Sequence, residues 1–208
     1  MIQDKATLKM YLAADRFALG KEGKSAIFSF DKVWRYQILL RKYEYYKNRS
    51  VGYEFLAMAF TKVRLKSLSY RLGFSIPINC FGPGLRINHS GLLVVNSVCK
   101  IGKWCDIHQG VNTGDNGVIR DNTWSNSVPI IGDYCFIGPG AKLFGGIVIG
   151  NEVRIGANSV VTKDLEDGVT AYGIPVVTHH TDKSLKTIAS KDFEAMFLEK
   201  HPEYIGLI

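Results

Sequence analysis

Histidine is the residue type in this chain that most directly suggests catalysis. The 208 residues contain five histidines, and two of them lie in the segments RINHSG (His89) and CDIHQG (His108). Imidazole titrates near neutral pH, so it can take a proton from a hydroxyl group and make that weak nucleophile reactive. The four cysteines form no CxxC pair, so neither a zinc motif nor a redox motif is indicated.

A repeat of six residues positions both histidines. From residue 81 onward, one position in six is a large apolar residue in eleven of twelve cases, and the next position is glycine in seven. No helix has this period, and hexapeptide periodicity is the signature of a parallel β-helix. The apolar residue is expected to point to the axis, and the glycine to permit the backbone of the corner. The twelve inward positions are Phe81, Ile87, Leu93, Ile101, Ile107, Thr113, Ile131, Ile137, Leu143, Ile149, Ile155 and Val161.

Three such hexads make one triangular coil, so about four coils are expected. Ile87 and Ile107 are one coil apart, which places Asn88 and His108 in successive coils at the strand spacing of about 4.8 Å. His89 should lie near the same corner. Gly102, Gly138 and Gly156 are expected to stack in the neighbouring column, which would give a groove suited to a long, thin ligand.

The slot two residues before each inward position holds small or modest side chains. Three of the four cysteines fall there, and a buried cysteine behaves as a small hydrophobe. These cysteines are therefore expected to be core residues rather than nucleophiles; they are Cys99, Cys105 and Cys135.

Residues 1–73 lack the six-residue repeat and have helical periodicity instead. Residues 30–73 predict two helices separated by a turn at 48–52 and stopped at Gly73, and 1–29 predict one helix and a loop. These helices are expected to cap one end of the β-helix, because a stack of coils leaves its end open. The apolar helix faces are expected to be Val33, Tyr36, Leu40 and Tyr43 in the first and Leu56, Phe60, Val63 and Leu68 in the second.

Charge is concentrated at the N-terminus. Residues 1–73 carry 15 Lys and Arg against 6 Asp and Glu, although the whole chain has a net charge of +7. Such a surplus attracts phosphates, anionic membrane surfaces or nucleic acid, and equally suits a solvated helix face. The composition excludes a disordered chain and a transmembrane helix, and we expect no secretory signal, so we expect a reduced, cytoplasmic protein.

The hexad region resembles the left-handed parallel β-helix acyltransferases, especially the serine O-acetyltransferase branch. The resemblance lies in GLRINHSGLLVVN, IGKWCDIHQGVNTG, PIIGDYCFIGPGAKLFGGIVIGNEVRIGANSVVTKD and AYGIP, and the run VWRYQILLRKYEYY resembles capsule and exopolysaccharide O-acetyltransferases. It implies a mainly β fold, with the left-handed β-helix between an N-terminal helical region and a short C-terminal helix. We divide the chain at 1–73, 74–180 and 181–208.

The resemblance also implies a chemistry. His89 would take the proton of the acceptor hydroxyl, with Asn88 and His108 as further catalytic groups, and backbone N–H groups would hold the oxyanion. Acetyl-CoA would be the co-substrate and no metal would be required. The residues implied along coenzyme A are Gly138, Gly140, Ala141, Gly156, Ala157 and Lys163.

The chain departs from serine acetyltransferases at three places. Asn88 replaces an aspartate, Val128 replaces a histidine before Pro129, and SIPINCFGPG replaces a segment with an aspartate. An ammonium buried without a carboxylate is costly, so we favour a sugar hydroxyl over free serine. Asn112 or Asp106, in the same subunit or across an interface, would then orient His89. The composition of 113–129 favours an extruded loop, and its length also allows an irregular extra coil. Arg120, Asp121 and Trp124 in this stretch, with Asn112 just before it, would contact the acceptor.

Three functions follow from these observations. The first is an acetyl-CoA-dependent O-acetyltransferase acting on a surface-polysaccharide sugar or its precursor, with the basic N-terminal third at the inner face of the membrane. The second is serine O-acetyltransferase of cysteine biosynthesis, and the third is a non-catalytic trimeric scaffold. We expect a homotrimer with active sites between neighbours and no nucleic-acid partner.

Overall fold

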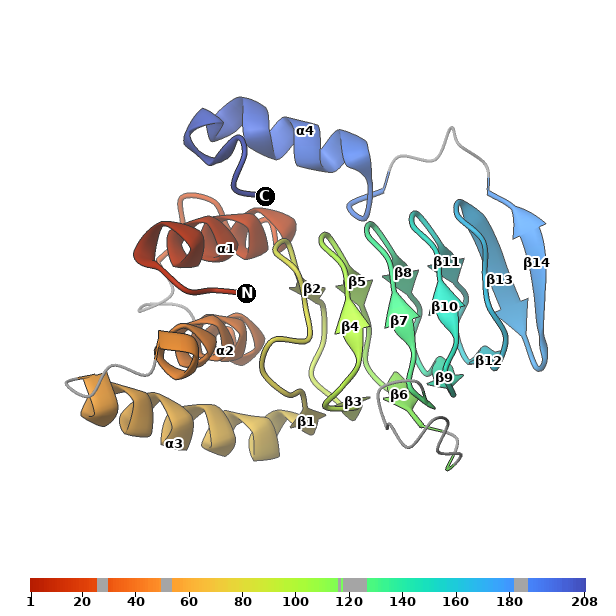
Figure 1. Cartoon of the computed structure of the whole chain (residues 1–208), viewed down its shortest axis with the longest axis horizontal. Coiled ribbons are helices and arrows are strands. Elements are labelled where there is room, and N and C mark those ends of the chain that lie inside the picture. Colours follow the sequence, from red (N-terminus) through yellow and green to blue (C-terminus); the bar gives the residue numbers. More distant parts are fainter. Residues whose placement is uncertain (26–29, 50–53, 116, 118–126, 182–186) are drawn as a thin grey trace.

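The protein is a parallel β-helix with helices at one end (Figure 1). The computed structural model describes residues 1–25, 30–49, 54–115, 117, 127–181 and 187–208. No helix among these residues is long and apolar enough to cross a membrane. The helical elements are α1 (Lys5–Ala18), α2 (Lys32–Arg49), α3 (Phe55–Leu72), α4 (Lys191–Lys200) and a 3-10 turn (Pro202–Tyr204).

Three sheets form the sides of the β-helix, and we name them A, B and C. Sheet A contains β1 (Phe74–Ser75), β3 (Leu93–Val95), β6 (Asn112–Gly114), β9 (Lys142–Phe144) and β12 (Val160–Val161). Sheet B contains β4 (Lys100–Ile101), β7 (Ile130–Ile131) and β10 (Val148–Ile149). Sheet C contains β2 (Arg86–Ile87), β5 (Asp106–Ile107), β8 (Phe136–Ile137), β11 (Arg154–Ile155), β13 (Val169–Gly173) and β14 (Val176–His180).

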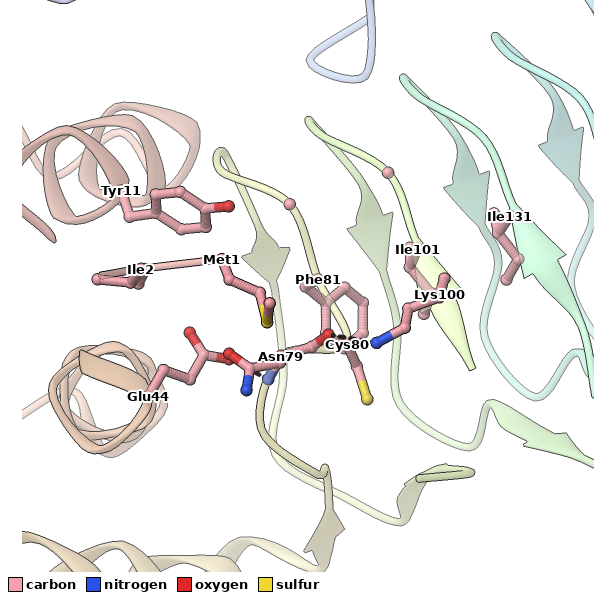
Figure 2. Close-up of a pocket in the computed structure, with 12 residues that line it drawn as sticks. Met1, Ile2, Tyr11, Glu44, Asn79, Cys80, Phe81, Lys100, Ile101 and Ile131 are labelled. Atoms are coloured by element: carbon pink, nitrogen blue, oxygen red, sulfur yellow. Dashed lines mark hydrogen bonds between the residues drawn. The ribbon is translucent and has the colours of Figure 1, made fainter. Parts of the chain in front are cut away.

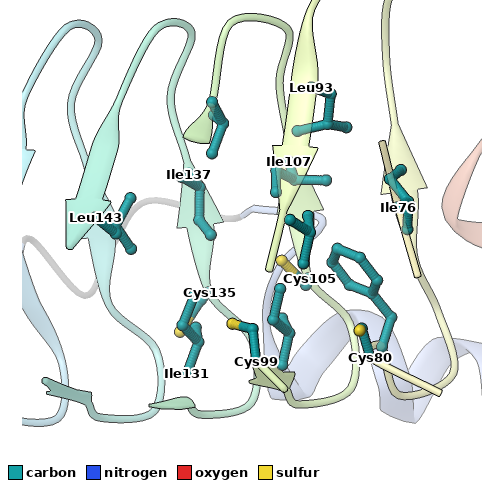
Figure 3. Close-up of a cluster of buried hydrophobic side chains, with 14 of the residues drawn as sticks. Ile76, Cys80, Leu93, Cys99, Cys105, Ile107, Ile131, Cys135, Ile137 and Leu143 are labelled. Carbon is teal, nitrogen blue, oxygen red and sulfur yellow. The ribbon is translucent and has the colours of Figure 1, made fainter. Parts of the chain in front are cut away.

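The hexad rule describes the core. All twelve predicted inward residues are buried, including the polar exception Thr113. Their strands pair in parallel and in register, so Ile87 lies beside Ile107, and Ile107 beside Ile137. Figure 3 shows part of this column, including Leu93, Ile107, Ile137 and Leu143, with the cysteines beside it. A continuous apolar column of this kind is the main source of stability in a solenoid, since each coil contacts only its neighbours.

All four cysteines are buried and free, as expected for core residues. Burial raises the pKa of Cys99 to about 11 and that of Cys80 and Cys135 to about 12. Burial also raises the pKa of Cys105 well above its ordinary value. These groups therefore remain thiols near neutral pH, and a thiol is a far weaker nucleophile than a thiolate.

The strands on either side of the segment between β6 and β7 belong to successive coils. Strand β4 pairs directly with β7, and β6 pairs directly with β9, so no extra rung lies between these coils. Arg120, Asp121 and Trp124, which we predicted to contact the acceptor, lie outside the described residues.

Glycine is required after the inward positions for a different reason from the one expected. None of the seven glycines adopts a positive φ. A Cβ on Gly138 would instead lie 2.8 Å from the carbonyl oxygen of Ile155, and one on Gly102 would lie 2.7 Å from the carbonyl carbon of Gly132. These contacts also separate the two residues: Gly102 stacks on Gly132 along sheet B, whereas Gly138 follows a strand of sheet C. The single column expected for Gly102, Gly138 and Gly156 was therefore wrong.

Helices α1 and α2 cap the first coil with buried polar side chains. Arg41 donates to the carbonyl oxygens of Phe81 (3.0 Å) and Gly82 (2.6 Å), and its Nε lies 2.8 Å from Asp15. Gln37 donates to the carbonyl oxygen of Leu85 at 2.8 Å, and Asp15 accepts the Leu85 backbone N–H at 2.8 Å. The backbone groups that have no preceding coil to pair with are thereby satisfied, which buried polar groups require.

The charge of Arg41 is fixed by its neighbours. Burial on its own would lower the pKa of this guanidinium. The carboxylates of Asp15 and Glu44 outweigh that effect and hold the Arg41 pKa above its ordinary value. The cap is therefore a compact ionic group that joins α1, α2 and the first coil.

The buried face predicted for α3 was wrong. In α3, Leu56, Phe60 and Val63 are exposed, and the helix buries Thr61, Leu65 and Leu72 instead. As predicted, Gly73 ends α3, and it does so in the left-handed conformation. His179 and His180 lie in β14 and pair with β13, and α4 ends before His201.

We expect Arg41→Ala to lower the free energy of unfolding by about 3–5 kcal/mol, because it leaves buried carboxylates without their partner. Lys42→Ala is the matched control, since Lys42 is exposed on the same helix. Urea denaturation followed by circular dichroism measures both. A loss for Arg41→Ala no larger than that for Lys42→Ala would contradict the capping role.

Candidate active site at the corner between sheets C and A

The two histidines meet at the corner where the chain passes from sheet C to sheet A. Because Arg86 pairs with Asp106 and Ile87 with Ile107, the next residues, Asn88 and His108, lie on adjacent rungs. The ring centroids of His89 and His108 are 6.4 Å apart. The juxtaposition expected from the repeat is thus present in the structure.

Asp106 is the centre of a polar network at this corner. Its Oδ2 lies 2.8 Å from Nη1 of Arg86, and its Oδ1 accepts from Nδ2 of Asn88 at 3.1 Å. Oδ1 also lies 3.4 Å from Nε2 of His108, which is 3.2 Å from Nδ2 of Asn88. The Asp106 side chain is only 6% exposed, so its charge is shielded from water and neutralised by Arg86.

The two histidines differ in their contacts: the His108 ring has polar partners, and the His89 ring is exposed. Nε2 of His108 faces Asn88 and Asp106, and its ring lies 5.0 Å from the ring of Phe136 on the next rung. His89 is exposed, and among the described residues no hydrogen bond reaches its ring. A side chain that is exposed beside a fixed polar network is accessible to a ligand and to the proton of that ligand.

Neither residue expected to orient His89 does so within this subunit. Asp106 is engaged with Arg86, Asn88 and His108. Asn112 lies on sheet A between Val94 and Lys142, one strand beyond the corner, and no hydrogen bond connects it to His89 among the described residues. The carboxylate at this corner therefore supports the second histidine rather than the first.

Small residues continue the corner along the β-helix. Gly138 and Gly156 occupy the places of Asn88 and His108 on the next two rungs. Gly110 and Gly140 follow at the turn with positive φ, and a Cβ on Gly110 would lie 3.1 Å from Gly140. These glycines form a strip of backbone that begins beside the two histidines, with the Asn158 side chain against Gly140 and the Tyr172 side chain against Gly156.

The residues expected along coenzyme A fall into three groups. Gly140, Gly156 and Ala157 are accessible at this strip, whereas Gly138 and Ala141 are buried. That these residues line coenzyme A stays a prediction. Lys163 is exposed but follows β12, so the width of sheet A separates it from the strip.

Tyr172 ends the same column. It follows Ala171 in β13, and its ring stacks on that of His179 with centroids 4.6 Å apart and an angle of 5° between the planes. Both rings are exposed. The strip therefore runs from a histidine pair at one end to an aromatic pair at the other.

Sequence reasoning missed several residues of this corner. Arg86 and Asp106 carry opposite charges at the same place in successive coils, and this signal could have revealed their ion pair. Gln109 gave no such signal, yet its Oε1 is buried with no hydrogen-bond partner among the described residues. Phe136 and Arg154 lie on the next two rungs in line with Arg86 and Asp106. The Arg154 guanidinium is 5.0 Å from the centre of the Phe136 ring.

A cavity of about 470 Å³ lies elsewhere, between the N-terminal segment and the first coils (Figure 2). Its lining includes Met1, Tyr11, Glu44 and Lys100 but none of the corner residues. Glu44 is occupied by Arg41 and by the backbone of Asn79. Within the described ranges, no group of three or more His, Cys, Asp or Glu residues is placed to hold a metal ion.

Comparison with known proteins agrees with this fold. Residues 129–163 match the family model for the bacterial transferase hexapeptide (six repeats). The β-helix is a hexapeptide-repeat domain. The chain is 37% identical over 102 residues to a serine acetyltransferase of Helicobacter pylori, an alignment that covers 49% of this chain and 57% of that protein. A serine acetyltransferase of Staphylococcus aureus is 40% identical over 94 residues, covering 45% and 42% of the two chains.

The chain thus spans about half the length of these curated relatives. Solved structures extend the similarity to the helical region. The serine acetyltransferase of Brucella abortus strain S19 superposes with a TM-score of 0.66 at 21% identity, over 87% of this chain and 72% of that one. A serine acetyltransferase in complex with CoA gives a TM-score of 0.65 at 23% identity, over 84% and 71%. At these identities the superpositions establish the fold.

Proposed function

We propose that this protein is an acetyl-CoA-dependent O-acetyltransferase whose active site is the corner between sheets C and A. The observation that carries the proposal is the placement of an exposed histidine, His89, beside the fixed group Asn88–Asp106–His108 at the start of the glycine strip. The hexapeptide-repeat domain and the serine acetyltransferase relatives support the same reaction class.

His89 would act as the general base. Its imidazole takes the proton of the acceptor hydroxyl, and the oxygen then attacks the carbonyl carbon of the thioester. The C–S bond breaks as the new C–O ester bond forms, and the imidazolium returns the proton to the departing thiolate. No acyl-enzyme is needed, which agrees with the elevated thiol pKa of the buried cysteines.

His108 would contact the substrates with the opposite side of its ring. Its Nε2 faces Asn88 and Asp106, so Nδ1 is the ring nitrogen available for a ligand. Arg86 neutralises Asp106 and keeps the carboxylate in place to hold the amide of Asn88. These three residues would therefore fix the orientation of His108, as supporting polar groups do at many catalytic sites.

The strip beside the histidines suits a pantetheine arm. Gly140 and Gly156 carry no side chains of their own on this path, where Asn158 lies against the first and Tyr172 against the second. The accessible backbone at Gly140 and Ala157 offers polar groups along it. Coenzyme A supplies the thioester on which the acetyl group arrives. Lys163 would contact coenzyme A only if the bound coenzyme extended across sheet A.

Serine is the acceptor that the relatives favour, because the proteins matched in sequence are serine acetyltransferases. The relatives therefore support serine, our alternative, better than the polysaccharide acceptor that we favoured from the sequence. A neutral sugar hydroxyl is the second candidate, and one observation favours it: Asp106, the carboxylate at this corner, is already paired with Arg86. An amino-acid ammonium would find no unpaired carboxylate there among the described residues.

We also propose a homotrimer. Ile130 and Val148 are exposed at outward positions on sheet B, where they form a flat apolar surface on adjacent rungs. Burying this surface against another copy would remove apolar area from water. A trimer would also allow a neighbouring subunit to supply the partner that His89 lacks among the described residues of its own chain.

We expect His89→Ala to lower turnover by roughly 100-fold or more while acetyl-CoA still binds, since the general base is lost but the strip is intact. Steady-state kinetics and calorimetric titration with CoA measure the two quantities. His180→Ala is the control, because His180 is exposed on β14. Unchanged turnover in His89→Ala would remove the mechanism.

An acetyl-CoA consumption assay across serine, amino sugars and neutral oligosaccharides tests the reaction and its acceptor. We expect release of free thiol that depends on a hydroxyl compound, with serine as the first acceptor and neutral glycans as the second. Activity with a glycan alone would reverse that order. Binding of neither CoA nor acceptor would leave the protein as a non-catalytic scaffold and overturn the proposal.

Light scattering at micromolar concentration tests the assembly. We expect a mass of three chains for the wild type and a smaller mass for Ile130→Glu/Val148→Glu, because two carboxylates cannot be buried unpaired. A wild-type monomer would contradict the proposed trimer.

A further inference from the structure

The outer face of α3 carries an unusual stripe of exposed apolar side chains. Leu56, Val63 and Tyr70 recur every seven residues, and Phe60 lies beside them on the same face. These four side chains are between 64% and 80% exposed. Isolated exposed apolar residues are common on proteins, but a contiguous stripe along one helix marks an interaction surface.

Basic residues border this stripe on both sides. The helical repeat of 100° per residue places Lys62 and Lys66 along one border and Arg64 and Arg71 along the other. The sequence of α3, FLAMAFTKVRLKSLSYRL, contains no acidic residue. The Arg64 guanidinium lies 5.4 Å from the ring of Phe60, and the Lys66 ammonium lies 5.9 Å from the ring of Tyr70.

The rest of the fold leaves this face uncovered. Helix α3 packs against α2 and the first strand through Thr61, Leu65 and Leu72, which are buried. It forms the outer edge of the helical end of the molecule (Figure 1). The face opposite the buried residues is therefore the one that carries the stripe.

A hollow lies along the lysine border. It has a volume of about 280 Å³ and is lined by Lys62 and Lys66 together with apolar residues that include Leu65, Ile76 and Pro77. Two ammonium groups above an apolar floor match a ligand with an anionic head and a hydrocarbon part. A phospholipid has that chemistry.

We infer that the outer face of α3 docks on an anionic lipid surface, with the stripe in the interface and the basic borders at the headgroups. An apolar face flanked by Lys and Arg is the pattern of helices that lie in the plane of a membrane interface. A second copy of the chain fits less well, because it would bring the four cations of each α3 close to those of the other.

This docking would place the proposed active site beside the lipid surface. The C-terminal end of α3 contacts the corner that carries His89, because the backbone N–H of Gly91 donates to the carbonyl oxygen of Leu72 at 2.9 Å. The inference itself does not depend on the proposed activity, since lipid binding is measured without any substrate.

Vesicle flotation with the 208-residue chain tests the inference. We expect binding to vesicles of phosphatidylglycerol and phosphatidylcholine, no binding to phosphatidylcholine alone, and release at high salt. Lys62→Gln/Lys66→Gln should reduce the partition coefficient by roughly 20- to 30-fold, since each basic residue near an anionic surface contributes about a fivefold change. Leu56→Ser/Val63→Ser should also release the protein.

Lys5→Gln/Lys9→Gln is the matched control, because it removes the same charge from exposed positions on α1. It should bind nearly as well as the wild type, and circular dichroism should show that all variants are folded. Equal losses in both double lysine variants would mean nonspecific attraction and overturn the inference. Absence of binding would also overturn it, as would a self-association that Leu56→Ser/Val63→Ser abolishes.

Discussion

The first coil of the β-helix depends on three side chains from the N-terminal helices. In a parallel stack each coil supplies hydrogen-bond partners for the next, and the first coil has no predecessor. Asp15, Gln37 and Arg41 take that place by bonding the backbone of residues 81–87. The ionic pairing of Arg41 with Asp15 and Glu44 keeps this group charged inside the protein.

This constraint reaches the candidate site directly. Strand β2 is both the strand that Gln37 holds and the strand that leads into Asn88 and His89. Its register against β5 places Asn88 beside His108 and Arg86 beside Asp106. A shift of one residue would turn Ile87 out of the core and separate the residues of the polar network. The register that buries the inward residues is therefore also the register that assembles the site.

Much of this arrangement follows from the sequence, because an axial position recurs every six residues. The repeat predicted all twelve inward residues, the buried cysteines and the juxtaposition of Asn88 with His108. The prediction that Gly102 and Gly138 share a column was wrong, because the loops between coils change which hexads stack on each other. The prediction of which face of α3 is buried was wrong, because that helix has two apolar stripes. The sequence alone does not say which of them packs against α2. The sequence predicted that the helices cap one end of the β-helix, but it could not identify the polar side chains that do so, since they bond residues up to 70 positions away.

The central claim is that the corner between sheets C and A is where acetyl transfer takes place. A crystal structure of the protein with CoA tests it most directly. The account predicts density along Gly140 and Ala157 with the sulfur beside His89 and His108. Coenzyme bound at another face, such as the cavity near Tyr11 and Lys100, would contradict it.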